Sequence, residues 1–469
     1  MTTDCIPQQL EFQGVGRRRV VASFDGGTLS SDGGALLLGE VERRRGILRQ
    51  FAACFQDRRH PALIEHSIEA LVSQRVLGLA LSYEDLNDHD VLRSDPLLAT
   101  LAGKADPTGS DRRRQEDRGK ALAGKSTLNR LELGAQTQDR YRKISLDEQA
   151  VDRFLVEVFL SAYESAPESI VLDLDATDDP LHGEQEGRFF HGYYGGYCYL
   201  PLYIFCGSHL LCARLRPSDR DASAGARGEV ERIVGQIRER WPEVEIILRG
   251  DSGFAREELM AWCEQHGVDY VFGLARNARL QRILGADLAQ AKTLSEASGK
   301  AERRYRDFSY QTRKSWSQAR RVIGKAEHLP RGANPRFVVT SLRSELWEPA
   351  PLYEQLYCAR GEMENRIKEQ QLCLFADRTS SHWMKSNQLR LWFSSVAYIL
   401  LSELRRLGLA GTDLAHARCD TIRLKLLKIG AQIRVSVRRV CVSLSSSYPY
   451  APLFTQVIRH LRAGPIAAG

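Results

Sequence analysis

The chain has 469 residues, enough for two or three domains with a sizeable core, and its formal net charge is +7. Its ten cysteines show no C-x-x-C pair or zinc-ligand spacing, so composition argues against a zinc-finger or disulfide-rich secreted protein and predicts reduced, mostly buried thiols. The polar start and the short, Ser-interrupted apolar stretch at residues 391–401 argue against a signal peptide and a membrane span, so we expect a cytosolic protein.

Residues 1–165 are predicted to form a separate, mainly helical region after a short strand at residues 19–25. Apolar residues between Pro61 and Leu79 recur at three- and four-residue steps, which predicts a helix. The sequence S-L-D-E at residues 145–148 is typical of a capping box, so a second helix is expected to begin there and run through Ala162.

A charged stretch at residues 107–118 predicts an exposed loop or linker. The sequence G-K-A-L-A-G-K-S follows it at residues 119–126 and matches the Walker A pattern. A true phosphate loop joins a buried strand to a helix, but the preceding sequence R-R-R-Q-E-D-R is too charged for a buried strand. We therefore expect Ser126 to cap a helix over residues 127–132, and a P-loop ATPase is the weaker alternative function.

Residues 166–275 show the pattern of an α/β domain. The expected elements are, in order, strands at 169–175, 188–205 and 209–216, a helix at 228–241, a strand at 244–251, a helix at 256–265 and a strand at 268–274. Three strands, helix, strand, helix, strand is the element order of an RNase H-like core. The fold class is therefore α/β, with a mixed sheet and flanking helices.

Residues 276–348 are too many for a single connection and predict a β-rich insertion in this core. Its expected strands lie at 303–310, 320–325 and 336–342. Residues 349–410 are expected to return to the core with a helix. On one face of that helix, residues recur at three- and four-residue steps: Tyr357, Arg360, Glu364, Lys368 and Gln371.

Three carboxylates from three separate elements indicate a metal-dependent nuclease chemistry. Asp175 and Asp251 fall at strand ends, where open α/β sheets bind ligands, and Glu364 lies on the helix. Such a set can hold two Mg²⁺ ions that activate the attacking and leaving oxygens of a phosphodiester. Tyr357, Arg360 and Lys368 are then candidate DNA contacts, with Arg360 and Lys368 facing phosphate. Asp173 projects from the same strand face as Asp175, so the choice between them stays open.

The C-terminal region, residues 411–469, is basic. No acidic residue follows Asp420, whereas eight Lys or Arg residues do, so the rest of the chain has a net charge of −1. These charges either contact a DNA backbone or form a solvated face. The candidates for DNA contact are Arg434, Arg438 and Arg439.

These motifs resemble those of the DD(E) insertion-sequence transposases, most closely the thirteen-eighty group of the four-like class. The resemblance rests on D-A-T at residues 175–177, on R-G-D-S-G-F at residues 249–254, and on Tyr, two residues, Arg, three residues, Glu at residues 357–364. It departs from the family signature at Gln371, where a Lys is expected, and Lys368 stands one turn earlier. The resemblance covers nearly the whole chain.

The resemblance implies a DNA transposase of a bacterial insertion sequence, acting in the cytosol near the nucleoid. Such an enzyme binds double-stranded DNA at the terminal inverted repeats, cleaves at the element ends and joins them to target DNA. It uses two Mg²⁺ ions, or Mn²⁺ in their place, works as a homodimer in the synaptic complex and needs no membrane. A transposase-derived DNA-binding repressor is the alternative.

The resemblance also implies roles for the flanking regions. Residues 1–165 would bind the inverted repeats, with Arg112, Arg113 and Arg114 as phosphate contacts unless their loop is simply solvated. The β insertion would grip the cleaved end, and Trp316 is a candidate for stacking on a flipped base, with core packing as the alternative.

Overall fold

The computed structural model describes residues 9–134 and 143–463, and the chain divides into two compact units. Unit 1 consists of Met1–Leu146 and Val396–Gly469, and unit 2 is Asp147–Ser395. Helix α14 (Met384–Gly408) contains the second boundary between them. Within the described ranges, no helix has the length and apolar character that a membrane span requires.

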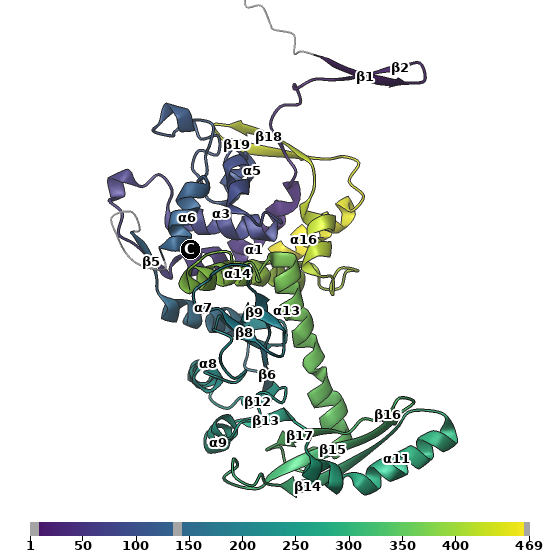
Figure 1. Ribbon diagram of the computed structural model, residues 1–469. Helices are drawn as coiled ribbons and strands as arrows, with labels where there is room; N and C mark the ends of the chain where they lie inside the picture. Colours follow the sequence, from purple (N-terminus) through teal and green to yellow (C-terminus); the bar gives the residue numbers. More distant parts are fainter. Residues whose placement is uncertain (1–8, 135–142, 464–469) are drawn as a thin grey trace, which may run out of the picture. The chain divides into compact units, whose positions relative to one another are not determined.

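Unit 1 is built mainly from helices (Figure 1). They are α1 (Leu36–Arg45), α2 (Ile47–Ala52), α3 (Ile68–Ala80), α4 (His89–Leu92), α5 (Pro96–Leu101), α6 (Lys125–Leu133), α15 (Cys419–Ile422) and α16 (Ala451–Arg462). The predicted helix near residues 61–79 is α3, which begins after Ser67, because the Ser67 side chain accepts a hydrogen bond from the Ala70 amide at 3.1 Å. All residues of α3 from Ala70 onward are buried.

The strands of unit 1 form small separate sheets. β18 (Ala431–Ser436) pairs with β19 (Arg439–Leu444) and with β3 (Leu29–Ser30). β1 (Leu10–Val15) and β2 (Arg18–Ala22) form a hairpin whose residues are all exposed. β4 (Phe55–Asp57) pairs with β5 (Ile144–Leu146).

The expected capping box at residues 145–148 is wrong. Ser145 lies within strand β5, and helix α7 (Glu148–Leu160) is capped by Asp147, whose side chain accepts a hydrogen bond from the Ala150 amide at 3.1 Å. Pairing with β4 holds Ser145 in extended backbone, so the next residue with a capping oxygen takes the N-cap position.

Unit 2 contains the expected RNase H-like sheet. Its strands are β6 (Ser169–Ala176), β10 (Leu202–Cys206), β11 (His209–Arg214), β12 (Glu245–Gly250) and β13 (Asp269–Leu274), in the spatial order β11-β10-β6-β12-β13. β6, β12 and β13 run parallel, while β10 is antiparallel to both β6 and β11. The α/β class expected from the sequence is confirmed.

The β-rich insertion continues this sheet. β17 (Arg336–Thr340) pairs antiparallel with β13, and β15 (Arg320–Leu329) and β14 (Glu302–Tyr310) extend the sheet beyond it, with β16 (Gly332–Ala333) beside β15. The insertion also holds two helices that the sequence analysis did not identify, α10 (Ala278–Ile283) and α11 (Gly285–Ser298), and α11 packs along β14 and β15 (Figure 1).

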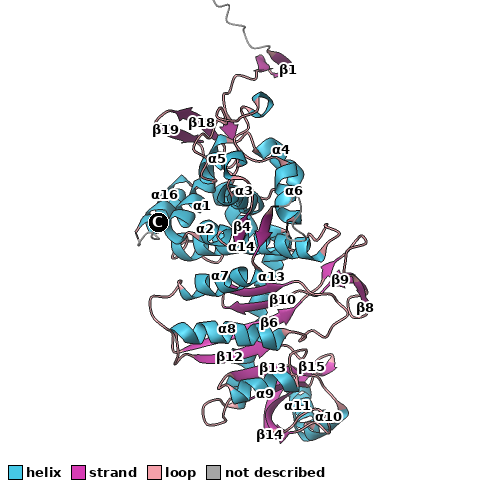
Figure 2. Cartoon of the chain, turned by 90° about the vertical axis from the view of Figure 1, so that its left-hand side faces the viewer, coloured by secondary structure: helices cyan, strands magenta, loops and turns pink. Residues whose placement is uncertain are grey.

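The two faces of the sheet carry different chemistry because side chains alternate along a strand. On β6, Leu172 and Leu174 point into the core that helices α7, α8 (Ala226–Arg240) and α9 (Glu257–Gln265) cover (Figure 2). Val171 packs on the opposite face, against the segment Leu352–Tyr357. Asp173 and Asp175 lie two and four residues after Val171 on β6, so their side chains point to the same face as Val171, the face that carries the segment Leu352–Tyr357.

Candidate active site

Asp175 and Asp251 lie side by side at the ends of neighbouring parallel strands. Leu174 of β6 is the register partner of Gly250 of β12, and Asp175 and Asp251 are the residues that follow these two partners. The Asp175 side chain is 16% exposed. The Gly253 amide donates to Asp251 Oδ1 at 2.8 Å, which fixes this carboxylate in the turn after β12.

Glu364 reaches the same pocket from an irregular helical segment, which we call the Glu364 segment. The segment is a π-helix over Leu352–Tyr357, a 3₁₀ turn over Cys358–Arg360, and then α13 (Gly361–Leu374). Such π-helical turns within helices are frequent at functional sites. Asp175, Asp251 and Glu364 together line one pocket of about 680 Å³, which we call the acid pocket.

Arg360 is the cation that contacts the acids of the acid pocket. Its guanidinium lies 2.7 Å from Glu364 Oε1 and 3.7 Å from Asp175 Oδ2. The pKa of Asp175 is raised to about 7, chiefly by burial; Arg360 opposes this rise, and Asp251 and Glu364 add to it. Four acidic side chains, Asp175, Asp178, Asp251 and Glu364, line the pocket together with two cationic ones, Arg360 and Lys368, so acids outnumber cations there.

A divalent cation fits this donor set by its chemistry. Among the residues that the structure describes, no three His, Cys, Asp or Glu side chains come close enough together to hold a metal ion in this arrangement, in which Arg360 bridges two of the acids. The acids nevertheless offer only carboxylate oxygens, the ligands that Mg²⁺ prefers, from three elements around one pocket.

Asp173 is held away from the acid pocket by Arg249. Arg249 Nε and Nη2 donate to the two Asp173 oxygens at 2.5 and 2.7 Å, and Nη1 donates to the Leu356 carbonyl at 2.5 Å. Asp173 and Arg249 are register partners on β6 and β12 and are 3% and 7% exposed. This Asp173–Arg249 pair, which the sequence analysis missed, ties both aspartate strands to the Glu364 segment.

A comparison with protein families shows which family this chain belongs to. The family model described as Transposase DDE domain group 1 matches residues 12–465, nearly the whole chain. The chain belongs to the DDE transposases. Among solved structures, it matches a cryo-EM structure of a piggyBac transposase synaptic complex with hairpin DNA, at 12% identity and a TM-score of 0.39, over 93% of this chain and 83% of that chain. A comparison with curated protein sequences gave no match.

Gln371 of the transposase, where the family signature has Lys, completes a buried contact. Its Nε2 donates to Asp179 Oδ1 at 2.9 Å and to the Asp178 carbonyl at 3.1 Å. Burial raises the pKa of the Asp179 carboxyl to about 8, so this acid is largely protonated at neutral pH and a neutral amide is a suitable partner. The contact joins α13 to the residues that follow Asp175.

This raised pKa links the stability of the transposase to pH. The folded state binds the Asp179 proton more tightly than the unfolded chain, whose Asp pKa is about 3.9. The stabilising contribution is therefore fully present below the unfolded value, and it is lost as pH rises toward about 8.

The other members of the predicted helix face divide between two pockets. Lys368 is exposed and lines the acid pocket, where the described residues offer it no hydrogen bond or ion pair. Tyr357 lines a neighbouring pocket of about 480 Å³ that also contains Asp251. The Tyr357 hydroxyl packs against Gly273 of β13, where an added Cβ would approach it to 2.6 Å.

Trp316 lies in the core of unit 2. It is 7% exposed, its ring contacts Tyr310 edge-on with the centroids 5.8 Å apart, and the Arg320 guanidinium lies 5.5 Å from its centroid. A buried ring offers no face to a flipped base, so this structure supports core packing, the other interpretation of this residue.

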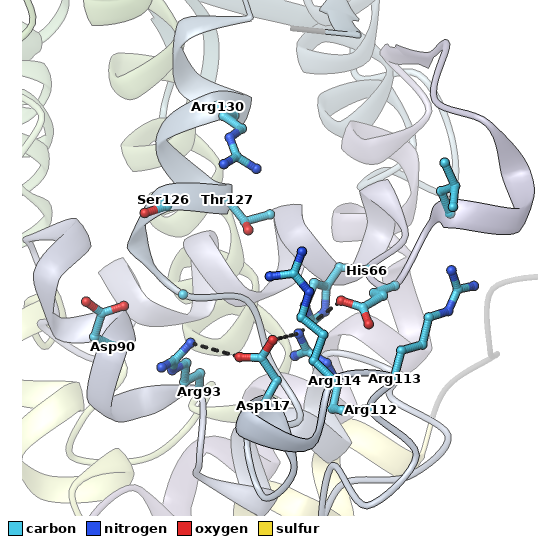
Figure 3. A pocket seen from close by; sticks show the side chains of 13 residues that line it. His66, Asp90, Arg93, Arg112, Arg113, Arg114, Asp117, Ser126, Thr127 and Arg130 are labelled. Carbon is cyan, nitrogen blue, oxygen red and sulfur yellow. Dashed lines mark hydrogen bonds and ion pairs between the residues drawn. The ribbon is translucent and has the colours of Figure 1, made fainter. Parts of the chain in front are cut away.

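The loop with Arg112, Arg113 and Arg114 lines a pocket of about 510 Å³ in unit 1 (Figure 3). Arg112 is 9% exposed and donates to the Lys120 carbonyl at 2.7 Å and to Glu65 at 3.1 Å, so its role here is structural. Arg113 and Arg114 are exposed. Figure 3 shows these arginines on one side of the pocket, with Arg130 and Thr127 of α6 on the other.

The Walker A-like sequence does not form a phosphate loop. Residues 107–124 contain turns and one 3₁₀ turn (Gln115–Asp117), with no strand before α6. The N-cap of α6 is Gly124, so the expected cap at Ser126 is wrong; Ser126 lies in the first turn of the helix. The strand that a phosphate loop requires is therefore missing at this place.

The basic C-terminal region divides into engaged and exposed cations. Lys428 lies 2.7 Å from Asp32, and Arg423 donates to the Ala80 carbonyl at 2.8 Å. Three arginines on or between β18 and β19 are exposed: Arg434, Arg438 and Arg439. The opposite face of this hairpin is apolar, with Ile433 packed into a core cluster.

Proposed function

We propose that this chain is a DNA transposase that cleaves the ends of its element at the acid pocket and joins them to target DNA. The observation that carries the proposal is the convergence of Asp175, Asp251 and Glu364 on one pocket from two adjacent parallel strands and one helix. Membership of the DDE transposase family supports it independently.

We infer that Asp175, Asp251 and Glu364 would hold Mg²⁺, or Mn²⁺ in its place. Bound there, two such ions lower the pKa of a coordinated water and offset charge on the attacking and leaving oxygens. The excess negative charge of the pocket supports cation binding, because carboxylates crowded in a partly buried site repel one another.

The cationic side chains of the pocket would position the phosphodiester. Arg360 contacts two of the acids, and a cation bound there would free its fork of N–H groups for a phosphate. Lys368, exposed on the same wall, would contact a neighbouring phosphate. The Asp173–Arg249 pair would keep the aspartate strands and the Glu364 segment in register while DNA enters.

Unit 1 would bind the terminal inverted repeats. Arg113 and Arg114 are exposed at the pocket of Figure 3, and the β18–β19 arginines are exposed as well. Exposed arginines attract the DNA backbone regardless of sequence, so they supply affinity and leave base recognition to other contacts. Because two element ends must be brought together, we also infer a homodimer in the synaptic complex.

The proposal is tested with a duplex that carries the element end, incubated with Mg²⁺. Asp175→Asn, Asp251→Asn and Glu364→Gln should each abolish strand cleavage and leave affinity for the duplex within about threefold, since each removes a ligand and no phosphate contact. Glu362→Gln is the matched control, because its side chain is 78% exposed on the same helix and should cleave normally. Cleavage at the wild-type rate by any of the three variants would refute the proposal.

A further inference from the structure

Five aromatic side chains are exposed within one short hairpin of unit 2. The hairpin consists of β8 (Phe189–His191), a glycine-rich turn and the start of β9 (Gly196–Tyr199), and we call residues 189–197 the aromatic hairpin. Its exposed rings are Phe189 (42%), Phe190 (60%), Tyr193 (87%), Tyr194 (36%) and Tyr197 (48%). Aromatic side chains gathered on a surface mark a binding site more often than scattered ones do.

The base of the aromatic hairpin is anchored firmly. The buried Tyr199 donates its hydroxyl to the Glu186 carbonyl at 2.6 Å, and the Ser218 hydroxyl donates to the Phe189 carbonyl at 2.9 Å. With β7 (Asp179–Pro180), the strands form a small sheet beside the ends of β6 and β10 (Figure 2). The exposed rings therefore project from a rigid support.

The tip of the hairpin is open. An added Cβ at Gly192, Gly195 or Gly196 would meet no atom within 4 Å, and Gly195 has a φ of +69°. Tyr193 lies in this turn, and its ring meets that of Tyr194 edge-on with the centroids 5.0 Å apart. The outer face of Tyr193 is thus available to a flat ligand.

The hairpin forms one wall of the acid pocket. His191, Tyr193 and Tyr194 line the same pocket as the three acids and Arg360. The rings of His191 and Tyr194 are 4.9 Å apart. A phosphodiester placed among the acids therefore has its flanking nucleotides within reach of these rings.

Nucleotide bases match this wall better than phosphate does, because the rings present flat apolar faces close to a negatively charged pocket. Bases inside a paired duplex are already stacked on one another, whereas unpaired bases beside a cut have free faces. We propose that the aromatic hairpin stacks on unpaired bases next to the scissile phosphodiester, with Tyr193 as the main stacking residue. This inference rests on the proposed function and specifies the DNA state that the pocket receives.

The test compares two short duplexes of equal length, without divalent metal, so that binding is separated from cleavage. One duplex is fully paired, and the other has mismatches in its terminal base pairs. The wild type should bind the mismatched duplex more tightly. Tyr193→Ala should lose on the order of 10-fold in affinity for the mismatched duplex and keep its affinity for the paired one, while Tyr193→Phe should behave as the wild type.

Leu346→Ala is the matched control, because Leu346 is another exposed apolar residue of unit 2, at 77% exposure, and its loss should change neither affinity. Unchanged binding of the mismatched duplex by Tyr193→Ala would overturn the stacking role. Conversion of a wild-type dimer to a monomer by Tyr193→Ala would also overturn it, because the rings would then belong to an interface between copies of the chain. If the wild type cuts element ends and only the mismatch preference is absent, the inference alone fails. If the wild type binds neither duplex and cuts no ends, the proposed function fails with it.

Discussion

Replacing Arg249 with methionine should destabilise unit 2 and slow catalysis, whereas a second change should restore stability alone. Asp173 and Arg249 are 3% and 7% exposed, so Arg249→Met leaves a buried carboxylate without its two charged hydrogen bonds. Removing one partner of a buried ion pair costs about 3–5 kcal/mol. The Leu356 carbonyl also loses its donor.

The double variant Asp173→Leu, Arg249→Met also removes the buried carboxylate that the single change leaves without a partner. A buried pair replaced by apolar side chains of similar volume is often neutral for stability, so the double variant should regain most of the loss. Its cleavage rate at saturating DNA should stay at least about 10-fold low, a loss of about 1.4 kcal/mol in transition-state stabilisation, because the Glu364 segment is no longer tied to β12.

Tryptophan fluorescence during denaturant unfolding measures the free energy of unfolding of unit 2, because every tryptophan of the chain lies in that unit. They are Trp241, Trp262, Trp316, Trp347, Trp383 and Trp392. A loss of less than about 1 kcal/mol in the free energy of unfolding of Arg249→Met would contradict this expectation, because breaking one side of a buried ion pair destabilises a protein by more than that. Wild-type cleavage by the double variant would show that the pair does not position the site.

Three further outcomes are expected. As pH rises from 5 to 8, the free energy of unfolding of Asp179→Asn should increase relative to that of the wild type, by up to about 1.4 kcal/mol per pH unit. The reason is that only the wild type has a buried carboxyl that stays protonated in the folded state. Parallel pH profiles of the two free energies would contradict this. Lys125→Ala should cleave DNA without nucleotide, as the wild type does, and an ATP requirement in either protein would restore the ATPase interpretation. Arg434, Arg438 and Arg439 changed together to Gln should weaken binding to specific and random duplexes equally, and should reduce the slope of DNA affinity against salt concentration by up to about three units. An unchanged slope in the folded variant would show that these arginines form a solvated face.

The sequence predicts the local pattern of this fold well. Alternating and apolar runs locate β6 and β12, and the strand ends identify Asp175 and Asp251, because strand position and burial are encoded within a few residues. The three-and-four-residue spacing places Arg360 and Glu364 on a common face, and both line the acid pocket.

The remaining features depend on contacts between distant residues. The proposed choice of Asp175 over Asp173 uses the pairing of Asp173 with Arg249, which is 76 residues away in the sequence. The charged residues around Arg112 in the sequence predict an exposed side chain, but Arg112 is buried and donates hydrogen bonds to Glu65 and to the Lys120 and Leu122 carbonyls. Trp316 is buried for a similar reason, since its environment forms only when β14 and β15 join the sheet.

The continuation of the core sheet by the insertion was also beyond the sequence pattern. Alternation predicts a strand but does not name its neighbour, so β17 could be expected as a strand while its pairing with β13 could not. The aromatic hairpin carries a clear signal in hindsight: exposed rings beside three glycines suit a binding wall better than a core strand.

The central claim, that these three carboxylates hold the catalytic cation, is tested most directly by a change of metal preference. Asp251→Cys replaces a hard oxygen ligand with a softer sulfur, which Mg²⁺ accepts poorly and Mn²⁺ accepts better. Cleavage of the element end by this variant should be lost in Mg²⁺ and recovered in Mn²⁺, whereas Asp173→Cys, which breaks the pair with Arg249, should not be rescued by Mn²⁺. Wild-type cleavage by Asp251→Cys in Mg²⁺, or failure of Mn²⁺ to rescue the folded variant, would contradict the account.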